Sequence, residues 1–116
     1  MDAARLLFPD SSFDRVYACG LHHHLSDDQV IDSLRETARV LAPDGRFVLL
    51  DNIWPSSALN LPAWILRRLD RGANIRSAAR IVELVSAAAL DVLSSEIFHY
   101  SWNGLEAVTV CARRCV

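Results

Sequence analysis

The fold is decided by residues 13–51, FDRVYACGLHHHLSDDQVIDSLRETARVLAPDGRFVLLD, in which two apolar runs flank an amphipathic segment. The runs 16–19 and 47–50 show no polar alternation, which favours central strands covered on both faces. A strand, a helix and a second strand joined in this way form a parallel crossover unit, which is almost always right-handed. The sequence therefore predicts an α/β domain.

A helix is predicted from Asp27 onward by its start signal and its periodicity. Ser26 is a suitable N-cap, Gln29 closes a capping box, and two aspartates in the first turn meet the positive end of the helix. Apolar residues then recur at helical spacing, at Val30, Ile31, Leu34, Ala38 and Leu41. We expect Pro43 to end the helix and Gly45 to permit the turn that follows.

Asp51 follows the second apolar run directly. Open α/β sheets place their ligands at the carboxyl ends of parallel strands, so Asp51 is a candidate substrate-binding residue. The alternative is a polar residue that merely ends a strand, because turn formers such as Asp are common there.

The rest of the chain predicts further covering elements. A short helix over about 62–71 carries Trp64 and either covers a pocket together with Trp54 or simply packs. A second helix is predicted from Ser77 to about Ala88, with its apolar stripe on the sheet. Residues 90–98 and 106–112 are strand-like and flank an Asn-Gly signal, which predicts a terminal antiparallel hairpin.

Bulk properties exclude several classes of protein. The chain has 116 residues, enough for one domain, and a net charge of −2 that gives no electrostatic footprint for nucleic acid. We interpret its local basic segment as a solvated helix face, formed by Arg67, Arg68, Arg71, Arg76 and Arg80. No apolar run approaches the roughly 20 residues of a membrane helix and no leader is recognisable, so a cytoplasmic protein without membrane contact is expected.

The three cysteines lack metal-ligand spacing; we expect reduced thiols, with Cys19 and Cys111 buried.

Several short motifs resemble, in order and spacing, those of class I S-adenosylmethionine-dependent methyltransferases of the type 11 group. In that family an Asp-Ala step precedes Leu-Pro-Phe, a small turn and Phe-Asp-x-Val; residues 2–16 read DAARLLFPDSSFDRV, with Leu7 replacing the proline. The match continues through HHL at 23–25, LRE at 34–36, RVL at 39–41 and PDGRF at 43–47, where Asp44 replaces the commoner glycine. This order agrees with the independent strand-helix-strand prediction.

The resemblance implies a Rossmann-like methyltransferase fold with strands in the family order four, five, seven, six. It covers only the later half of the family domain, so residues 1–116 are expected to form a single partial domain. Family members hold the cofactor S-adenosylmethionine with a Gly-rich loop after the first strand and an acidic residue after the second. The glycines here stand at 20, 45, 72 and 104, without G-x-G spacing. We therefore expect the domain to be truncated and the isolated chain to be inactive.

The resemblance also implies cofactor-binding residues. Asp2 and Ala3 match the pair that lies against the adenine, where the carboxylate accepts from the exocyclic amine. A frayed chain end without a partner is the alternative for both residues. Ala18 and Cys19 match the end of the strand that faces the cofactor.

Two histidines are the catalytic candidates. His23 and His24 match the family loop near the transferred methyl group, where a histidine orients the acceptor or takes its proton. A metal site made of His22, His23 and His24 is a poorer interpretation, because successive residues point in different directions and no Cys, Asp or Glu lies at ligand spacing. We expect no metal ion.

Two functions are compatible with these observations. The first is a methyltransferase for a small-molecule acceptor, completed by an N-terminal half from a separate polypeptide or from upstream coding sequence. Methyl transfer needs mostly alignment, so few dedicated side chains are expected. The second is a non-catalytic methyltransferase-like interaction module, or a gene fragment, that forms a homodimer or a complex through the exposed edge of the strand at 16–19.

Overall fold

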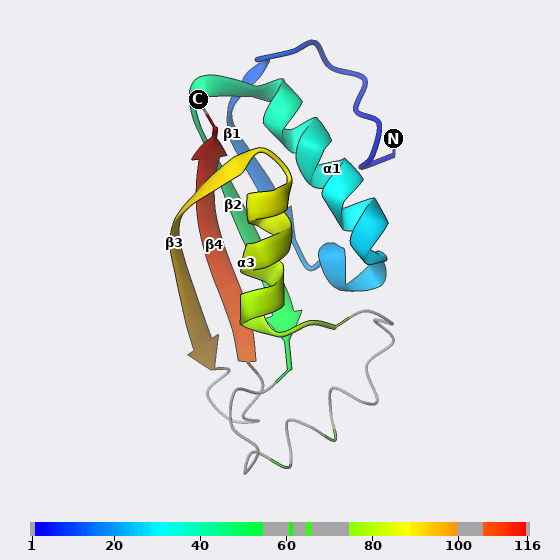
Figure 1. Cartoon of the computed structure of the whole chain (residues 1–116), viewed down its shortest axis with the longest axis vertical. Coiled ribbons are helices and arrows are strands. Elements are labelled where there is room, and N and C mark those ends of the chain that lie inside the picture. Colours follow the sequence, from blue (N-terminus) through cyan, green and yellow to red (C-terminus); the bar gives the residue numbers. More distant parts are fainter. Residues whose placement is uncertain (1, 55–60, 62–64, 66–74, 100–105, 116) are drawn as a thin grey trace.

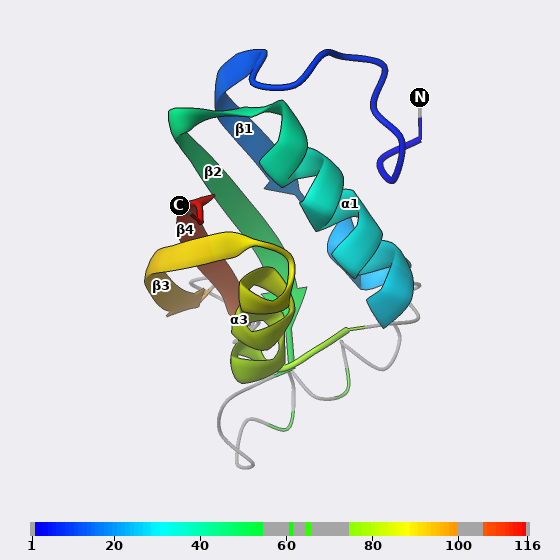
Figure 2. The same ribbon diagram turned by 45° about the horizontal axis from the view of Figure 1, so that its top comes forward.

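The computed structural model describes residues 2–54, 61, 65, 75–99 and 106–115. The elements in chain order are β1 (Phe13–Cys19), the 3-10 turn η1 (His22–His24), α1 (Asp27–Val40), β2 (Leu41–Ile53), α3 (Ala78–Ala87), β3 (Leu90–His99) and β4 (Glu106–Arg114). The strands form one mixed sheet in the order β1-β2-β4-β3, in which β1 and β2 are parallel and the other pairs antiparallel. Both helices lie on the same face of this sheet (Figure 1 and Figure 2).

This arrangement confirms the α/β fold that the sequence predicts. The unit β1-α1-β2 is the parallel crossover, and β3 and β4 form the antiparallel pair with β4 next to β2. In the family numbering implied by the resemblance, the observed order is four, five, seven, six. Only Ile65 of the predicted helix at 62–71 is described, in a helical conformation; Trp64 and the Asn103-Gly104 turn lie outside the described residues.

Helix α1 begins as predicted and ends earlier. Ser26 Oγ accepts from the Gln29 backbone N–H at 3.3 Å, and Gln29 Oε1 accepts from the Ser26 N–H at 3.0 Å, which completes the capping box. The last helical residue is Val40, and Leu41 is already paired with Phe13 of β1. Sheet pairing therefore ends the helix before Pro43 is reached, which corrects the expectation that the proline does so.

Gly45 lies where β2 passes close to its neighbours. A Cβ at this position would lie 2.7 Å from Leu41 Cδ1 and 3.0 Å from the carbonyl oxygen of Asp14, a residue of β1. The approach of the two strands at this end of the sheet thus requires a residue without a side chain.

The core lies between the two helices and the inner face of the sheet. Along β2 the buried side chains alternate with half-buried ones, so Phe47, Leu49, Asp51 and Ile53 all face the helices. Leu34 of α1 is fully buried in the same cluster. Each large apolar side chain in this position contributes about 1.5–3 kcal/mol through burial. Asp51 is therefore a carboxylate placed on the apolar face of a core strand.

The opposite face of the sheet is open in the described residues, which corrects the prediction of strands covered on both faces. Tyr17 is 74% exposed, and Cys19 is exposed rather than buried, while Cys111 is half-buried. The register pairs Tyr17 with Val48 and Cys19 with Leu50, so these side chains share the open face. An apolar strand sequence alone does not determine how many of its faces are covered.

The arginine segment is not a simple solvated face where the structure describes it. Arg76 is only 8% exposed, and the exposed Arg80 pairs with both Asp27 and Glu83. Arg67, Arg68 and Arg71 lie outside the described residues. In the described part of the chain, no helix has the length and apolar character needed to cross a membrane.

The N-terminal segment lies along α1 (Figure 1), where Glu36 and Arg39 hold it. Glu36 Oε2 accepts from the Leu6 backbone N–H at 2.9 Å, and Arg39 donates to the carbonyl oxygens of Leu6 and Phe8 at 3.0 and 2.9 Å. Arg39 also donates to Glu36 Oε1 at 2.8 Å. The hydrogen bonds from Arg39 and then from Leu6 lower the pKa of Glu36 to about 2. Ionised Glu36 therefore contributes to the attachment of the segment, both by its own hydrogen bond with Leu6 and by orienting Arg39.

We expect Glu36 to make stability depend on pH in a defined window. Its folded-state pKa of about 2 lies below the ordinary 4.5, so this contribution to stability is complete above pH 4.5 and is lost as the pH falls toward 2. Denaturant unfolding between about pH 5 and pH 2 should show a shallower loss of stability for Glu36→Gln than for wild type. The exposed Asp32 on the same helix gives the control, Asp32→Asn. A Glu36→Gln curve parallel to wild type would contradict this prediction.

Candidate active site

The candidate site lies at the carboxyl ends of the parallel strands β1 and β2, the edge where open α/β sheets bind ligands. Gly20 follows β1 and extends its ladder by donating to the Leu50 carbonyl at 2.9 Å. The φ of Gly20 is +67°, a conformation that residues with side chains rarely adopt. This turn directs the chain into η1 and brings its three imidazoles beside the end of β2.

The Asp51 carboxylate is the centre of the site. It is 1% exposed, because the alternation of β2 directs it toward the helices. One oxygen accepts from His23 Nδ1 at 2.7 Å and from the Asn52 backbone N–H at 2.8 Å. The other oxygen accepts from the His22 backbone N–H at 2.8 Å. Both oxygens accept hydrogen bonds and the side chain is almost fully buried. Asp51 can therefore influence a ligand through the His23 ring that it orients.

His23 is the imidazole that Asp51 orients. A carboxylate only accepts hydrogen bonds, so the 2.7 Å contact assigns a proton to Nδ1 and leaves Nε2 as the nitrogen that can exchange a proton with a ligand. His23 is 7% exposed, whereas His24 is exposed and stacks on it with ring centroids 4.0 Å apart. Of the two predicted catalytic histidines, only His23 is fixed by the carboxylate.

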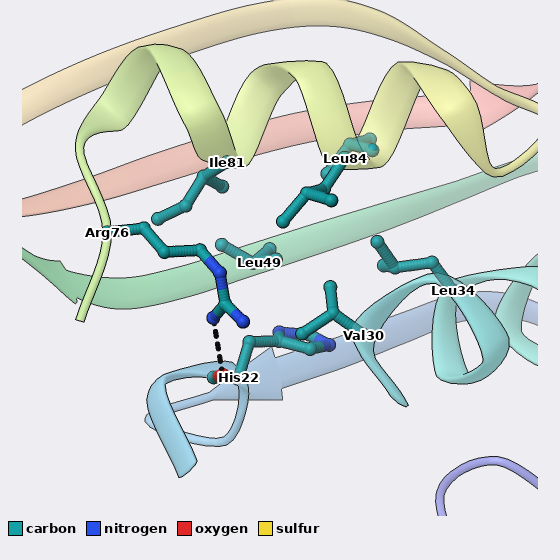
Figure 3. A pocket seen from close by; sticks show the side chains of 8 residues that line it. His22, Val30, Leu34, Leu49, Arg76, Ile81 and Leu84 are labelled. Atoms are coloured by element: carbon teal, nitrogen blue, oxygen red, sulfur yellow. Dashed lines mark hydrogen bonds between the residues drawn. The ribbon is translucent and has the colours of Figure 1, made fainter. Parts of the chain in front are cut away.

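His22 is a buried structural residue in the same turn. Its ring lies in a pocket between the helices (Figure 3), with Nε2 3.3 Å from Ser33 Oγ. The apolar wall of this pocket is formed by Val30, Leu34, Leu49, Ile81, Leu84 and Val85. Burial lowers the pKa of His22; Asp51 opposes this effect, and Arg76 and His23 add to it. His22 is therefore neutral near pH 7.

The structure brings together only some of the predicted residues. His23 and Asp51 are in contact, and Ala18 lies on the helix-facing side of β1 while Cys19 lies on the open side. Asp2 and Ala3 are in the N-terminal segment, where Asp2 Oδ1 accepts from the Ala4 backbone N–H at 2.9 Å. Their place against an adenine stays a prediction.

Sequence reasoning missed two residues that build the site, His22 and Arg76. Three successive histidines do not reveal which one meets Asp51, and an arginine before a helix cap has no distinctive pattern. Among the described residues, no group of three or more Cys, His, Asp or Glu side chains has a geometry that could hold a metal ion.

Comparison with known proteins finds similarity to methyltransferases. Residues 1–49 match the model of a methyltransferase domain. The uncharacterized methyltransferase YcgJ of Bacillus subtilis (strain 168) is 49% identical over 53 residues, which are 46% of this chain and 20% of that protein. The 27-O-demethylrifamycin SV methyltransferase of Amycolatopsis mediterranei (strain S699) is 42% identical over 62 residues, 53% of this chain and 22% of that protein. The first 49 residues are therefore similar to a methyltransferase domain, and the two relatives of this part of the chain are methyltransferases.

A solved methyltransferase structure shows the same fold over the whole chain. The S-adenosylmethionine-dependent methyltransferase of Methanosarcina mazei superposes with a TM-score of 0.80 at 18% identity, covering 100% of this chain and 66% of that one. The chain spans about a fifth of the length of the two curated methyltransferases above. The residues matched by the methyltransferase model include the histidine turn and end two residues before Asp51.

Replacing Asp51 should test how strongly the site depends on it. Asp51→Asn keeps the shape but turns one accepting oxygen into an NH₂ group that faces an N–H donor. We expect the free energy of unfolding at pH 7, measured with denaturant, to fall by about 1–3 kcal/mol. Asp32→Asn, on the exposed face of α1, is the matched control. Equal stability of Asp51→Asn and wild type would show that these contacts contribute nothing.

Proposed function

We propose that the chain is the acceptor-activating part of an S-adenosylmethionine-dependent methyltransferase that acts on a small molecule. The observation that carries this proposal is the 2.7 Å contact between His23 Nδ1 and the buried Asp51 carboxylate, at the edge of the sheet where ligands bind. Two similar proteins support it: the Amycolatopsis mediterranei relative is a 27-O-demethylrifamycin SV methyltransferase, and the Methanosarcina mazei protein of the same fold is an S-adenosylmethionine-dependent methyltransferase.

The proposed role of His23 is to take the proton of the acceptor. Asp51 binds Nδ1–H and leaves Nε2 to receive a proton from a hydroxyl or an amine. The imidazolium that forms then lies against a carboxylate 2.7 Å away, in a buried place where screening is weak. This arrangement favours acceptors that carry a proton on the attacking atom.

S-adenosylmethionine, when bound, supplies an electrophilic methyl group whose bond to sulfur breaks as the bond to the acceptor forms. The described residues fit this cofactor in part. Asp2 is exposed, so its carboxylate is accessible to an adenine amine. Ala18 and Cys19 end β1 with small side chains, and a Cβ at Gly20 would meet only His23 Cε1, at 4.0 Å, within the described residues. A complementing N-terminal half would supply the remaining contacts.

Methyl transfer should distinguish His23 from His24. The assay uses radiolabelled S-adenosylmethionine and 27-O-demethylrifamycin SV as the first hydroxyl acceptor, with the chain alone and with the preceding segment of the Bacillus subtilis relative added. We expect transfer with the added segment, a kcat reduced by about 10²–10⁴-fold in His23→Gln, and little change in His24→Gln.

Binding is measured in the same samples by calorimetric titration with S-adenosylhomocysteine. Saturable binding supports the cofactor assignment even where the first acceptor is not a substrate, and further hydroxyl and amine acceptors are then tested. Absence of binding and of transfer in the complemented, folded sample would refute the proposal. Equal activity of His23→Gln and wild type would refute the role of His23.

A second candidate function is that of an interaction module, favoured by the open face of the sheet. β1 is an edge strand of the described sheet, and Tyr17 on its open side is 74% exposed beside Val48. An apolar face next to an unpaired strand edge is a surface that binds partners. The partner would be a second copy or a methyltransferase-like chain.

We also propose that the protein is cytoplasmic, because its three cysteines are free and thiols stay reduced in that compartment.

Sizing chromatography with light scattering tests this second function. We expect the chain to form a dimer or larger species, and Tyr17→Arg to shift it toward the monomer, because a charge on the face disfavours burial. Leu7 is 76% exposed but lies in the N-terminal segment, so Leu7→Arg is the matched control and should leave the mass unchanged. A wild-type chain that is a monodisperse monomer would contradict the prediction.

A further inference from the structure

Arg76 connects the end of β2 to the histidine turn. It directly precedes Ser77, the N-cap of α3. Its backbone forms a parallel bridge with Ile53, and its carbonyl oxygen accepts from the Trp54 N–H at 3.0 Å. The backbone of Arg76 is therefore fixed to the strand that carries Asp51.

The side chain of Arg76 reaches from this position across the turn. It is 8% exposed and donates to the His22 carbonyl at 2.8 Å, to the Leu25 carbonyl at 2.6 Å and to Asp27 Oδ1 at 2.7 Å. Figure 3 shows the guanidinium extending from the segment before α3 to the His22 carbonyl oxygen. A planar guanidinium can donate to several fixed acceptors at once, which the point charge of a lysine does less well.

Arg76 and Asp51 hold opposite groups of the same short turn. Asp51 accepts from the His22 backbone N–H and from the His23 ring, whereas Arg76 donates to the carbonyls of His22 and Leu25. Both residues are attached to the end of β2. The turn therefore cannot shift relative to β2 without breaking hydrogen bonds on one side or the other.

The charge of Arg76 is balanced locally. Its Nε lies 2.7 Å from Asp27 Oδ1, and the exposed Arg80 lies 2.8 Å from the other oxygen of the same carboxylate. Hydrogen bonds from Arg80 and then Arg76 lower the pKa of Asp27, so it stays ionised at neutral pH. Arg80 shares this carboxylate, but within the described residues its guanidinium donates to Asp27 and Glu83 and not to the turn, which makes it a matched comparison for Arg76.

We propose that Arg76 is a positioning residue of the methyl-transfer site, which fixes the histidine turn so that Asp51 can hold His23 with Nε2 available to the acceptor. This inference rests on the proposed function of His23. Arg76 acts through the turn and does not touch the acceptor or the cofactor. If Arg76 were merely stabilising, its replacement would lower the free energy of unfolding without changing the protonation pattern of the His23 ring.

The ¹⁵N chemical shifts of the His23 ring nitrogens in the full chain provide the test, since they report which nitrogen carries the proton. In wild type at a pH where imidazole is neutral, we expect a protonated Nδ1 and a bare Nε2. In Arg76→Gln both shifts should move toward the averaged values of a free imidazole, because the released turn no longer keeps the ring on Asp51. Arg80→Gln, which removes the other partner of Asp27 and the pairing with Glu83, should keep the wild-type shifts.

A folded Arg76→Gln variant with wild-type ring shifts would overturn the inference. If that variant does not fold, Arg76→Lys, which keeps a charge beside Asp27, is measured instead. Ring shifts that move toward those of free imidazole support the inference, and wild-type ring shifts overturn it. Wild type provides a further measurement that needs no variant: the guanidinium N–H signals of Arg76 should be resolved and exchange slowly with water. Rapid exchange and free rotation of that group would also overturn the inference.

Kinetics of the complemented enzyme separate this inference from the proposed function. We expect Arg76→Gln to lower kcat by about 10- to 100-fold while changing the KM for S-adenosylmethionine by less than about twofold, because alignment and not cofactor contact is lost. A wild-type enzyme without methyl transfer would refute the proposed function but leave the ring-shift test of Arg76 intact. Wild-type kcat in Arg76→Gln, with His23→Gln inactive, would refute the inference alone.

Discussion

The buried carboxylate of Asp51 is the constraint on which the site depends. A carboxylate that is 1% exposed on the apolar face of a core strand is costly unless N–H groups satisfy it. The chain supplies these groups from His22, His23 and Asn52. The conformation of the histidine turn follows from this need, and the positive φ of Gly20 is what lets the chain reach the carboxylate.

The start of α1 and the central strands can be predicted from the sequence, because interactions between residues close in the chain determine them. The capping box of Ser26 and Gln29 marks the start of α1, and the unbroken apolar run before Asp51 marks a core strand. The sequence also places Asp51 at the carboxyl end of a parallel strand, where ligands commonly bind, and its role as a site residue stays a prediction. What the sequence does not show is that the same alternation buries Phe47, Leu49 and Asp51 on one face.

The remaining features depend on contacts between distant residues. The end of α1 at Val40 is set by the pairing of Leu41 with Phe13. Whether a face of β1 is exposed depends on which other elements pack on the sheet, and the sequence of the strand does not contain this information. Arg76 lies in a run of arginines that composition assigns to solvent, yet it is buried because Asp27 and two carbonyls meet it there. His23 and His24 are adjacent and chemically identical, and they differ in the structure because the ring of His23 is hydrogen-bonded to Asp51. Long-range geometry, and not residue type, separates these roles.

The network around His23 joins three elements of the described residues, and this bears on the proposed function. Asp51, the histidine turn and Arg76 come from the end of β2, from η1 and from the lead-in to α3, and folding of these elements already fixes their geometry. The ordering of the base would thus be complete before an acceptor binds. Because methyl transfer gains most from alignment, such preorganisation lowers the barrier without a large set of reacting side chains. If the proposed function holds, this preorganisation would account for a sequence with few catalytic signals.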